Sequence, residues 1–109
     1  MAESKIRKTS GNPTIVYDST DSSTNIRTQV VANGTCVTVS SFRNDGGQTK
    51  SGWTEIATIP SGYEPNIWLY GYFAGSDNNI LRYRIRSASV EVYSPQAGVQ
   101  LGCCLSYPI

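Results

Sequence analysis

The sequence predicts an all-β protein, an antiparallel sandwich or barrel. From Ile26 onward, turn-forming residues recur about every ten residues and separate runs rich in β-branched and aromatic residues. Apolar and polar residues alternate within these runs, and no window keeps the 3.6-residue apolar period of a helix over three turns. A chain of 109 residues is long enough for one modest core. We therefore expect one β domain over residues 26–109.

The first 25 residues are expected to form a polar arm or linker. They carry almost no apolar periodicity and no apolar segment of the kind a signal peptide contains. They leave room for one short strand at residues 14–17. Such an arm would dock on a neighbouring subunit or connect to an upstream protein.

Turn chemistry sets the order of the predicted elements. Asn33-Gly34 favours positive φ and lies between residues 29–31 and 36–39, which predicts a β-hairpin. The segment from Pro60 to Pro65 is a rigid corner, because proline is excluded from central strands. Strands are predicted around this corner at residues 53–59, 67–73, 80–86, 89–93 and 99–107.

Alternation assigns the faces of these strands. In residues 81–86 the apolar side chains point one way and three arginines the other, and in residues 90–93 the valines point inward and Glu91 outward. In the last strand one face carries Val99, Leu101, Cys103, Leu105 and Tyr107.

The run from Ile67 to Phe73 is apolar on both sides. Alternation assigns one set to the core (Ile67, Leu69 and Phe73) and the other to the opposite face (Trp68, Tyr70 and Tyr72). A strand with two apolar faces implies that its second face is covered by another layer, a partner subunit or a ligand.

Composition argues against catalysis and cofactor chemistry. The chain has no histidine, so it lacks the commonest general base and the commonest transition-metal ligand. No pair among the eight acidic residues has a spacing that singles it out for glycoside hydrolysis. We expect no enzyme activity, no cofactor and no metal. The net charge of +1 argues against nucleic acid as a partner, and the lack of a long apolar run argues against membrane insertion.

The three cysteines do not suit a disulfide framework or a zinc site. An odd number at these spacings lacks the pairs or the four ligands required. We expect Cys36, Cys103 and Cys104 to be small buried hydrophobic residues in a reducing environment, with Cys103 and Cys104 on opposite faces of a strand.

Two features could bind a ligand. The aromatic face and the polar loop after it suit a saccharide, because sugar rings stack on aromatic rings and hydroxyls need fixed polar partners. The candidate residues are Trp68, Tyr70, Tyr72, Asp77, Asn78 and Arg82. The competing interpretation is that these aromatics pack in an oligomer interface. The arginines at 82, 84 and 86 could grip an anion, or could form a solvated face paired with Glu91.

Four segments together resemble a known family. These are residues 52–65 (GWTEIATIPSGYEP), 81–86 (LRYRIR), 90–93 (VEVY) and 105–109 (LSYPI). They are similar to the C-terminal head domains of receptor-binding proteins from phage tail fibres and baseplates, mainly of phages that infect Gram-positive bacteria. The resemblance spans residues 30–109. Glu64 stands where that pattern often has a basic residue, and Ser87-Ala88-Ser89 replaces its usual Asp-Gly turn.

The resemblance implies a jelly-roll or Greek-key head domain that forms a homotrimer and binds saccharides, teichoic acids or another receptor on the host surface. It implies attachment to an upstream tail or baseplate protein through the arm, and a place in the virion after synthesis in the bacterial cytoplasm. It also implies a structural role for residues of the corner and core (Trp53, Pro60, Gly62, Tyr63 and Pro65).

Two other functions remain open at this point. One is a structural trimerising tip or decoration domain of a virion, with only protein contacts. The other is a bacterial carbohydrate-binding module.

Overall fold

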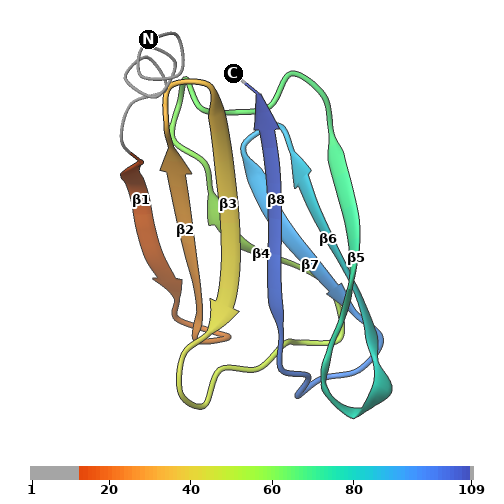
Figure 1. Cartoon of the computed structure of the whole chain (residues 1–109). Coiled ribbons are helices and arrows are strands. Elements are labelled where there is room, and N and C mark those ends of the chain that lie inside the picture. The colour runs from red at the N-terminus through yellow and green to blue at the C-terminus, as the bar shows by residue number, and fades with distance from the viewer. Residues whose placement is uncertain (1–12, 109) are drawn as a thin grey trace, which may run out of the picture.

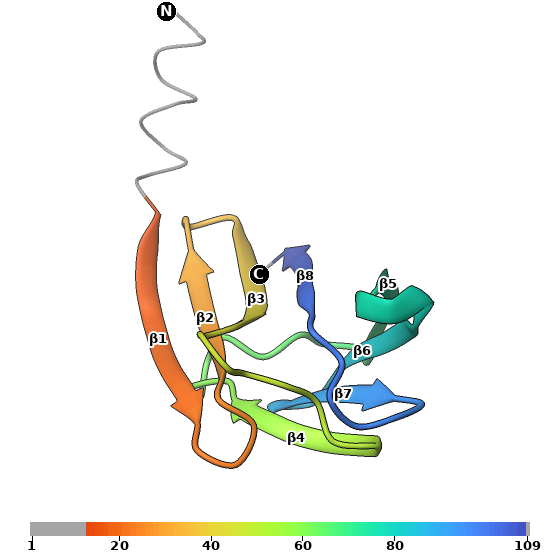
Figure 2. The same ribbon diagram turned by 90° about the horizontal axis from the view of Figure 1, so that it is seen from below.

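The computed structural model describes residues 13–108 as two four-stranded antiparallel sheets packed face to face (Figure 1). The first sheet has the order β1-β2-β3-β8, formed by β1 (Thr14–Asp21), β2 (Ile26–Ala32), β3 (Cys36–Arg43) and β8 (Gly102–Pro108). The second has the order β4-β7-β6-β5, formed by β4 (Gly52–Thr58), β7 (Ser89–Ser94), β6 (Ile80–Arg86) and β5 (Leu69–Ala74). Seen along the strands, the two sheets form separate layers (Figure 2). The predicted all-β class is confirmed, as a sandwich.

The second sheet is a Greek key. Strands β5, β6 and β7 are joined in sequence by two hairpin connections, and β4 reaches the sheet through a long connection and lies beside β7. This order makes β5 an edge strand, next to β8 of the other sheet (Figure 1). The placement of β5 at an edge leaves one of its sides without a strand partner in the described chain.

The hairpin predicted at Asn33-Gly34 is confirmed. Gly34 has φ +93°, and the Asn33 side chain accepts hydrogen bonds from the backbone N–H groups of Thr35 and Cys36. Because only glycine adopts this φ without strain, the turn fixes the register of β2 against β3, with Ala32 opposite Val37.

The short strand expected at residues 14–17 is confirmed and is longer, because β1 runs to Asp21. It lies within the segment expected to be an arm, and it pairs with β2 along its whole length with a bulge at Val16. The part of that segment before Pro13 lies outside the described residues.

The core lies between the sheets, and the predicted inward faces are confirmed for β6, β7 and β8. Leu81, Tyr83 and Ile85 have no exposed surface, and neither do Val90 and Val99, while Leu105 is partly buried. The last predicted strand begins later than expected, at Gly102, although Val99 and Leu101 are buried.

The prediction for Ile67 is wrong. Its side chain is 68 % exposed, because β5 begins only at Leu69 and residue 67 belongs to the loop before it. Leu69 and Phe73 pack against the core as predicted. Gly71 lies between them on the inner face, where a Cβ atom would come within 2.8 Å of the Phe73 ring and 3.2 Å of Leu105 on β8. The glycine therefore allows the edge of the sandwich to close.

A buried chain of hydroxyl groups connects the two sheets. The Tyr83 hydroxyl of β6 lies 2.6 Å from Ser41 Oγ of β3, which lies 2.8 Å from Thr28 Oγ1 of β2. All three side chains are buried, and burial raises the pKa of the Tyr83 phenol far above its ordinary value. The phenol therefore stays neutral and its polar end is hydrogen-bonded, which satisfies the usual requirement for burial.

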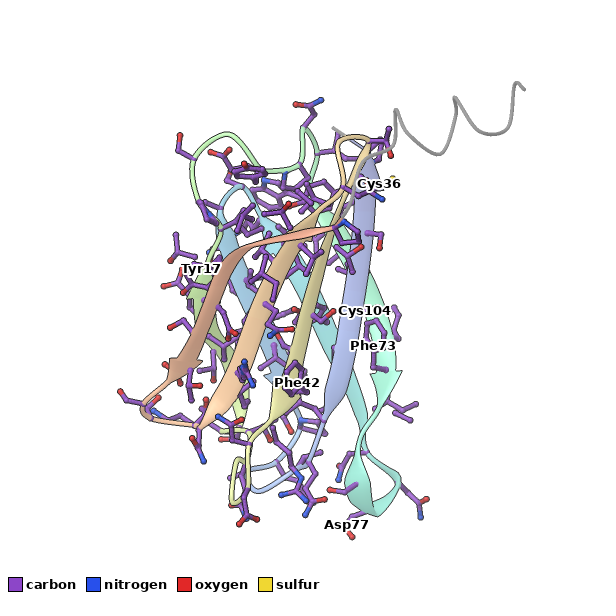
Figure 3. All side chains as sticks on the ribbon, turned by 60° about the vertical axis from the view of Figure 1, so that its left-hand side comes forward. Tyr17, Cys36, Phe42, Phe73, Asp77 and Cys104 are labelled. Carbon is purple, nitrogen blue, oxygen red and sulfur yellow. The ribbon has the colours of Figure 1, made fainter. Side chains whose placement is uncertain are left out.

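The expectation of buried cysteines is wrong for two of the three residues. Cys103 is buried, but Cys36 and Cys104 are exposed (Figure 3). Cys104 follows the alternation of β8 onto the outer face, so the predicted opposition to Cys103 is confirmed. Cys36 is exposed because it is the first residue of β3, beside the hairpin turn.

The corner at residues 60–65 forms a turn, and a hydrogen bond connects it to β8. The Tyr63 N–H donates to the Pro60 carbonyl, and Gly62 between them has φ +95°, as a type II turn requires. The Tyr107 hydroxyl of β8 donates to the Tyr63 carbonyl over 2.5 Å. The corner is thus tied to the opposite sheet.

Candidate functional site

The outer face of the second sheet carries aromatic and charged side chains in rows across its strands. Strand register places Trp53, Tyr93, Arg82 and Tyr72 in one row, from β4 to β5. The next row is Glu55, Glu91, Arg84 and Tyr70. The alternation of β6 supplies the arginines to this face, because Leu81, Tyr83 and Ile85 are in the core.

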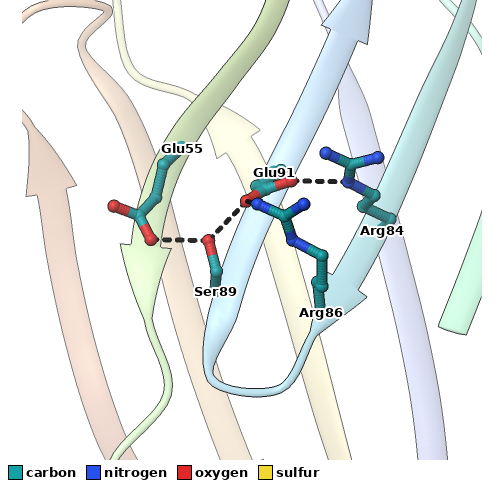
Figure 4. A network of polar contacts seen from close by, with 5 residues as sticks. All are labelled: Glu55, Arg84, Arg86, Ser89 and Glu91. Carbon is teal, nitrogen blue, oxygen red and sulfur yellow. Dashed lines mark hydrogen bonds and ion pairs between the residues drawn. The ribbon is translucent and has the colours of Figure 1, made fainter. Parts of the chain in front are cut away.

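In one half of this face the charged and aromatic side chains contact one another, and we call this the closed half. The Arg84 guanidinium lies 3.7 Å from the centre of the Trp53 ring, and Arg84 Nε donates to Glu91 Oε1 over 2.5 Å. Arg86 also donates to Glu91, over 3.2 Å (Figure 4). The Arg84 guanidinium therefore covers one face of the Trp53 ring. The expectation that Trp53 fixes the core is wrong, since it lies on the outer face, 37 % exposed.

Two carboxylates meet in this closed half. Glu55 and Glu91 are directly opposite each other, and Ser89 Oγ lies 2.5 Å from one and 2.7 Å from the other (Figure 4). A hydroxyl has one proton, so Ser89 donates to one carboxylate at a time. The like charges are tolerated because the two arginines neutralise Glu91.

The pKa of Glu91 reflects these competing effects. Burial raises the pKa of this carboxyl, but hydrogen bonds from Ser89 and Arg84 and the charges of Arg84 and Arg86 lower it by more. The net pKa is below the ordinary value, so Glu91 is ionised at neutral pH. A carboxylate with this pKa is a structural counter-ion and not a proton donor.

The other half of the face is open, and we name it the β5 platform. It consists of Trp68, Tyr70 and Tyr72 with Ile80 and Arg82. The three aromatic side chains are 54 %, 55 % and 70 % exposed, although aromatic residues of this size are normally buried for the most part. Neighbouring exposed rings on one surface indicate a contact site.

Arg82 is held on the platform by aromatic rings alone. Its guanidinium lies 5.9 Å from the Tyr72 ring centre and 5.3 Å from that of Tyr93. It forms no ion pair with any residue from 13 to 108, in contrast to Arg84 and Arg86. Its N–H donors are therefore available to a ligand.

The structure brings together four of the six predicted binding residues. Tyr70, Tyr72 and Arg82 lie on adjacent strands of one face. Trp68 comes just before β5, and its ring lies 5.6 Å from the guanidinium of Arg86 on β6. Asp77 and Asn78 lie in the turn between β5 and β6, beyond the end of the platform (Figure 3). They adopt positive φ there, and the described chain contains no hydrogen bond from either side chain to the aromatic residues.

Sequence reasoning missed that Tyr93 and Trp53 share this face. The alternation in residues 90–93 already assigned Tyr93 to the side opposite the valines, so that signal was present. These two residues lie in one row with Arg82 because β4 lies beside β7. Alternation along a single strand does not predict which strands are neighbours.

The groups that the platform exposes are aromatic rings, an isoleucine and a guanidinium. Within the described residues no three potential ligands gather to hold a metal ion, and no helix is long and apolar enough to cross a membrane. Aromatic rings beside a guanidinium can stack on sugar rings and donate to oxygen atoms. No family model, curated protein or solved structure matches the chain.

Proposed function

We propose that the chain is a receptor-binding head domain of a phage tail, which forms a homotrimer and binds a saccharide of the host cell surface through the β5 platform. The observation that supports binding is the exposure of three large aromatic side chains on one face, beside a guanidinium without an acidic partner. No enzyme activity, cofactor or nucleic acid is part of this proposal.

A saccharide suits this surface for physical reasons. The C–H faces of sugar rings lose water favourably when they stack on Tyr72 and Tyr70, and their hydroxyls accept from guanidinium N–H donors. The phenol hydroxyls supply further hydrogen bonds at the edge of the surface. The rings come from a strand of a packed sheet, so they are ordered before the ligand arrives and lose little entropy on binding.

The resemblance in residues 52–65 and 105–109 supports the assignment to a phage head domain. Residues 52–65 form β4 and the corner, and residues 105–108 belong to β8, which the Tyr107 hydroxyl ties to that corner. The edge position of β5 supports self-association, because an edge strand with exposed aromatic residues attracts a partner.

The first experiment is the molar mass in solution, measured by light scattering on a sizing column. A mass three times the 11.9 kDa of the chain is expected. A monomer would contradict the head-domain assignment and favour a bacterial carbohydrate-binding module with the same platform.

The second experiment is a glycan array with the full chain and two variants. Tyr72→Ala is expected to abolish binding, because it removes the most exposed ring of the platform. Phe42→Ala is the matched control, because Phe42 lies on the outer face of the other sheet, also beside an arginine. Equal loss in both variants, or no glycan bound by the natural chain, would overturn saccharide binding.

A structural tip with only protein contacts is the second candidate. Ile67 and Ile80, at the two ends of the platform, are 68 % and 65 % exposed, and such aliphatic groups favour a protein partner over a sugar. Under this alternative the rings would be wholly covered in the trimer, and fluorescence of Trp68 would be insensitive to an added aqueous quencher.

A further inference from the structure

We infer that the saccharide bound on the β5 platform presents one anionic group to this face, and that Arg82 is the residue that selects it. This inference rests on the proposed function. The charge is a carboxylate of an acidic sugar or a phosphodiester between sugars, since both present paired oxyanions to a guanidinium.

The argument begins with the unequal surroundings of the three arginines of β6. Arg84 is 16 % exposed and is held by both Trp53 and Glu91. Arg86 shares the same carboxylate and lies 5.6 Å from the Trp68 ring. Their positive charges are compensated within the sheet, so they have little attraction left for an anion.

Arg82 differs because both of its neighbours across the sheet are tyrosines. Rings attract the guanidinium and hold its position, but they do not neutralise its charge or use its in-plane N–H donors. A positive charge that is ordered but has no counter-ion attracts an anion more strongly than a freely rotating one, because less side-chain entropy is lost on binding.

The acidic residues of the face determine where an anion can bind. Glu55 and Glu91 lie in the row of Arg84, and they repel a second negative charge there. The row of Arg82 contains no acidic residue. The anion is therefore expected between Tyr72 and Tyr93, with a neighbouring sugar ring stacked on Tyr72.

The test compares pairs of oligosaccharides that differ only in charge. One pair is an oligogalacturonate and its neutral methyl ester, and the other is a phosphodiester-linked hexose oligomer and the neutral oligomer of the same hexose. We expect the natural chain to bind at least one acidic member about tenfold or more tightly than its neutral partner, as for a charge-assisted hydrogen bond. The pair that shows this preference identifies the source of the charge.

The variants assign the preference to one residue. Arg82→Gln should remove it, and Arg82→Lys should retain part of it, because lysine keeps the charge without the planar donors. Arg43→Gln is the control, since it makes the same change in net charge at an exposed arginine on the first sheet. The preference should survive in that variant, and thermal unfolding should confirm that all the variants are folded.

Equal effects of Arg82→Gln and Arg43→Gln would overturn the inference, because net charge alone would then explain the preference. Binding of the neutral and acidic members with the same affinity would also overturn it, while leaving saccharide binding itself intact. Failure to bind any saccharide, neutral or acidic, would overturn the proposed function together with this inference.

Discussion

At the scale of single residues, Glu91 organises the closed half of the second sheet's outer face. It accepts hydrogen bonds from Arg84, Arg86 and Ser89. The guanidinium of Arg84 also covers the Trp53 ring. Removal of one partner from a buried ion pair leaves the other charge uncompensated, which costs more than the pair itself contributes. This residue therefore determines which part of the face stays closed.

We predict that Glu91→Gln lowers the free energy of unfolding by about 2 kcal/mol at pH 7, because the partly buried Arg84 loses its counter-charge but keeps one acceptor. Urea denaturation would measure the change. Glu55→Gln is the control, since Glu55 is exposed and its one side-chain hydrogen bond within residues 13–108 comes from Ser89; its effect should be within about 0.5 kcal/mol.

The same residue gives a pH dependence. The folded pKa of Glu91 is lowered, so its contribution to stability is complete above the unfolded pKa of about 4.3. That contribution is lost as the pH falls from there through the lower folded pKa. The difference between the natural chain and Glu91→Gln should shrink over that acid range, and a difference that is constant with pH would contradict the ion pair.

At the scale of elements, the β5–β6 hairpin presents the platform, and its turn packs on the core. Gly75 begins this turn, and a Cβ atom there would lie 2.6 Å from Val99 Cγ1 and 3.1 Å from Leu81 Cγ. Ser76 ties the turn to the segment before β8, through its N–H to the Gln100 carbonyl and its hydroxyl to the Gln100 N–H. The hairpin is thereby anchored at the end next to Tyr72.

We predict that Gly75→Ala destabilises the fold by about 1–3 kcal/mol, because both neighbours are fully buried and have no room to move. The midpoint of urea denaturation measures this. Gly102→Ala provides the comparison, since nothing lies within 4 Å of an added Cβ atom there. If both alanine variants were as stable as the natural chain, the packing around Gly75 would be looser than described.

The β6–β7 hairpin carries backbone strain at Ser87, which has φ +56° in the two-residue turn between Arg86 and Ser89. An L-residue in this region costs about 1–2 kcal/mol, and glycine recovers most of this at an entropic cost of about 0.5–1 kcal/mol. Ser87→Gly should therefore raise the stability by about 0.5 kcal/mol in thermal unfolding. A lower melting temperature would show that the Ser87 side chain contributes a stabilising contact.

At the scale of the whole molecule, the exposed β5 platform is apolar surface that association between subunits would bury. A chain of this size has a thin core, and further apolar surface is buried when subunits associate. The platform lies on an edge strand, so a subunit or a ligand can approach both its side chains and its free backbone groups. In the proposed function, assembly and binding would therefore use the same strand.

We predict that Tyr70→Asp prevents assembly or saccharide binding while the domain stays folded, because a charge on an exposed face disturbs contacts and not the core. Sizing-column light scattering and circular dichroism would measure both properties. Ser106→Asp, on the exposed face of β8, is the matched control and should assemble normally. A folded trimer of Tyr70→Asp with full binding would contradict the role of the platform.

The sequence by itself determined the fold class, most strand positions and the inward faces, because alternation and turn chemistry are local properties. It also determined that Tyr70 and Tyr72 share one face, since residues two apart in a strand point the same way. The exposure of Ile67 could not be predicted in this way. It depends on where β5 begins, and that start depends on the position of the chain after the corner from Pro60 to Pro65.

Only the tertiary structure decided which of these side chains are free. The order β4-β7-β6-β5 brings Trp53 under Arg84 and sets Glu91 between two arginines, which closes one half of the face. The same order leaves β5 at an edge and gives Arg82 two tyrosines as neighbours. Contacts across strands depend on partners distant in the chain, and local patterns do not specify those partners.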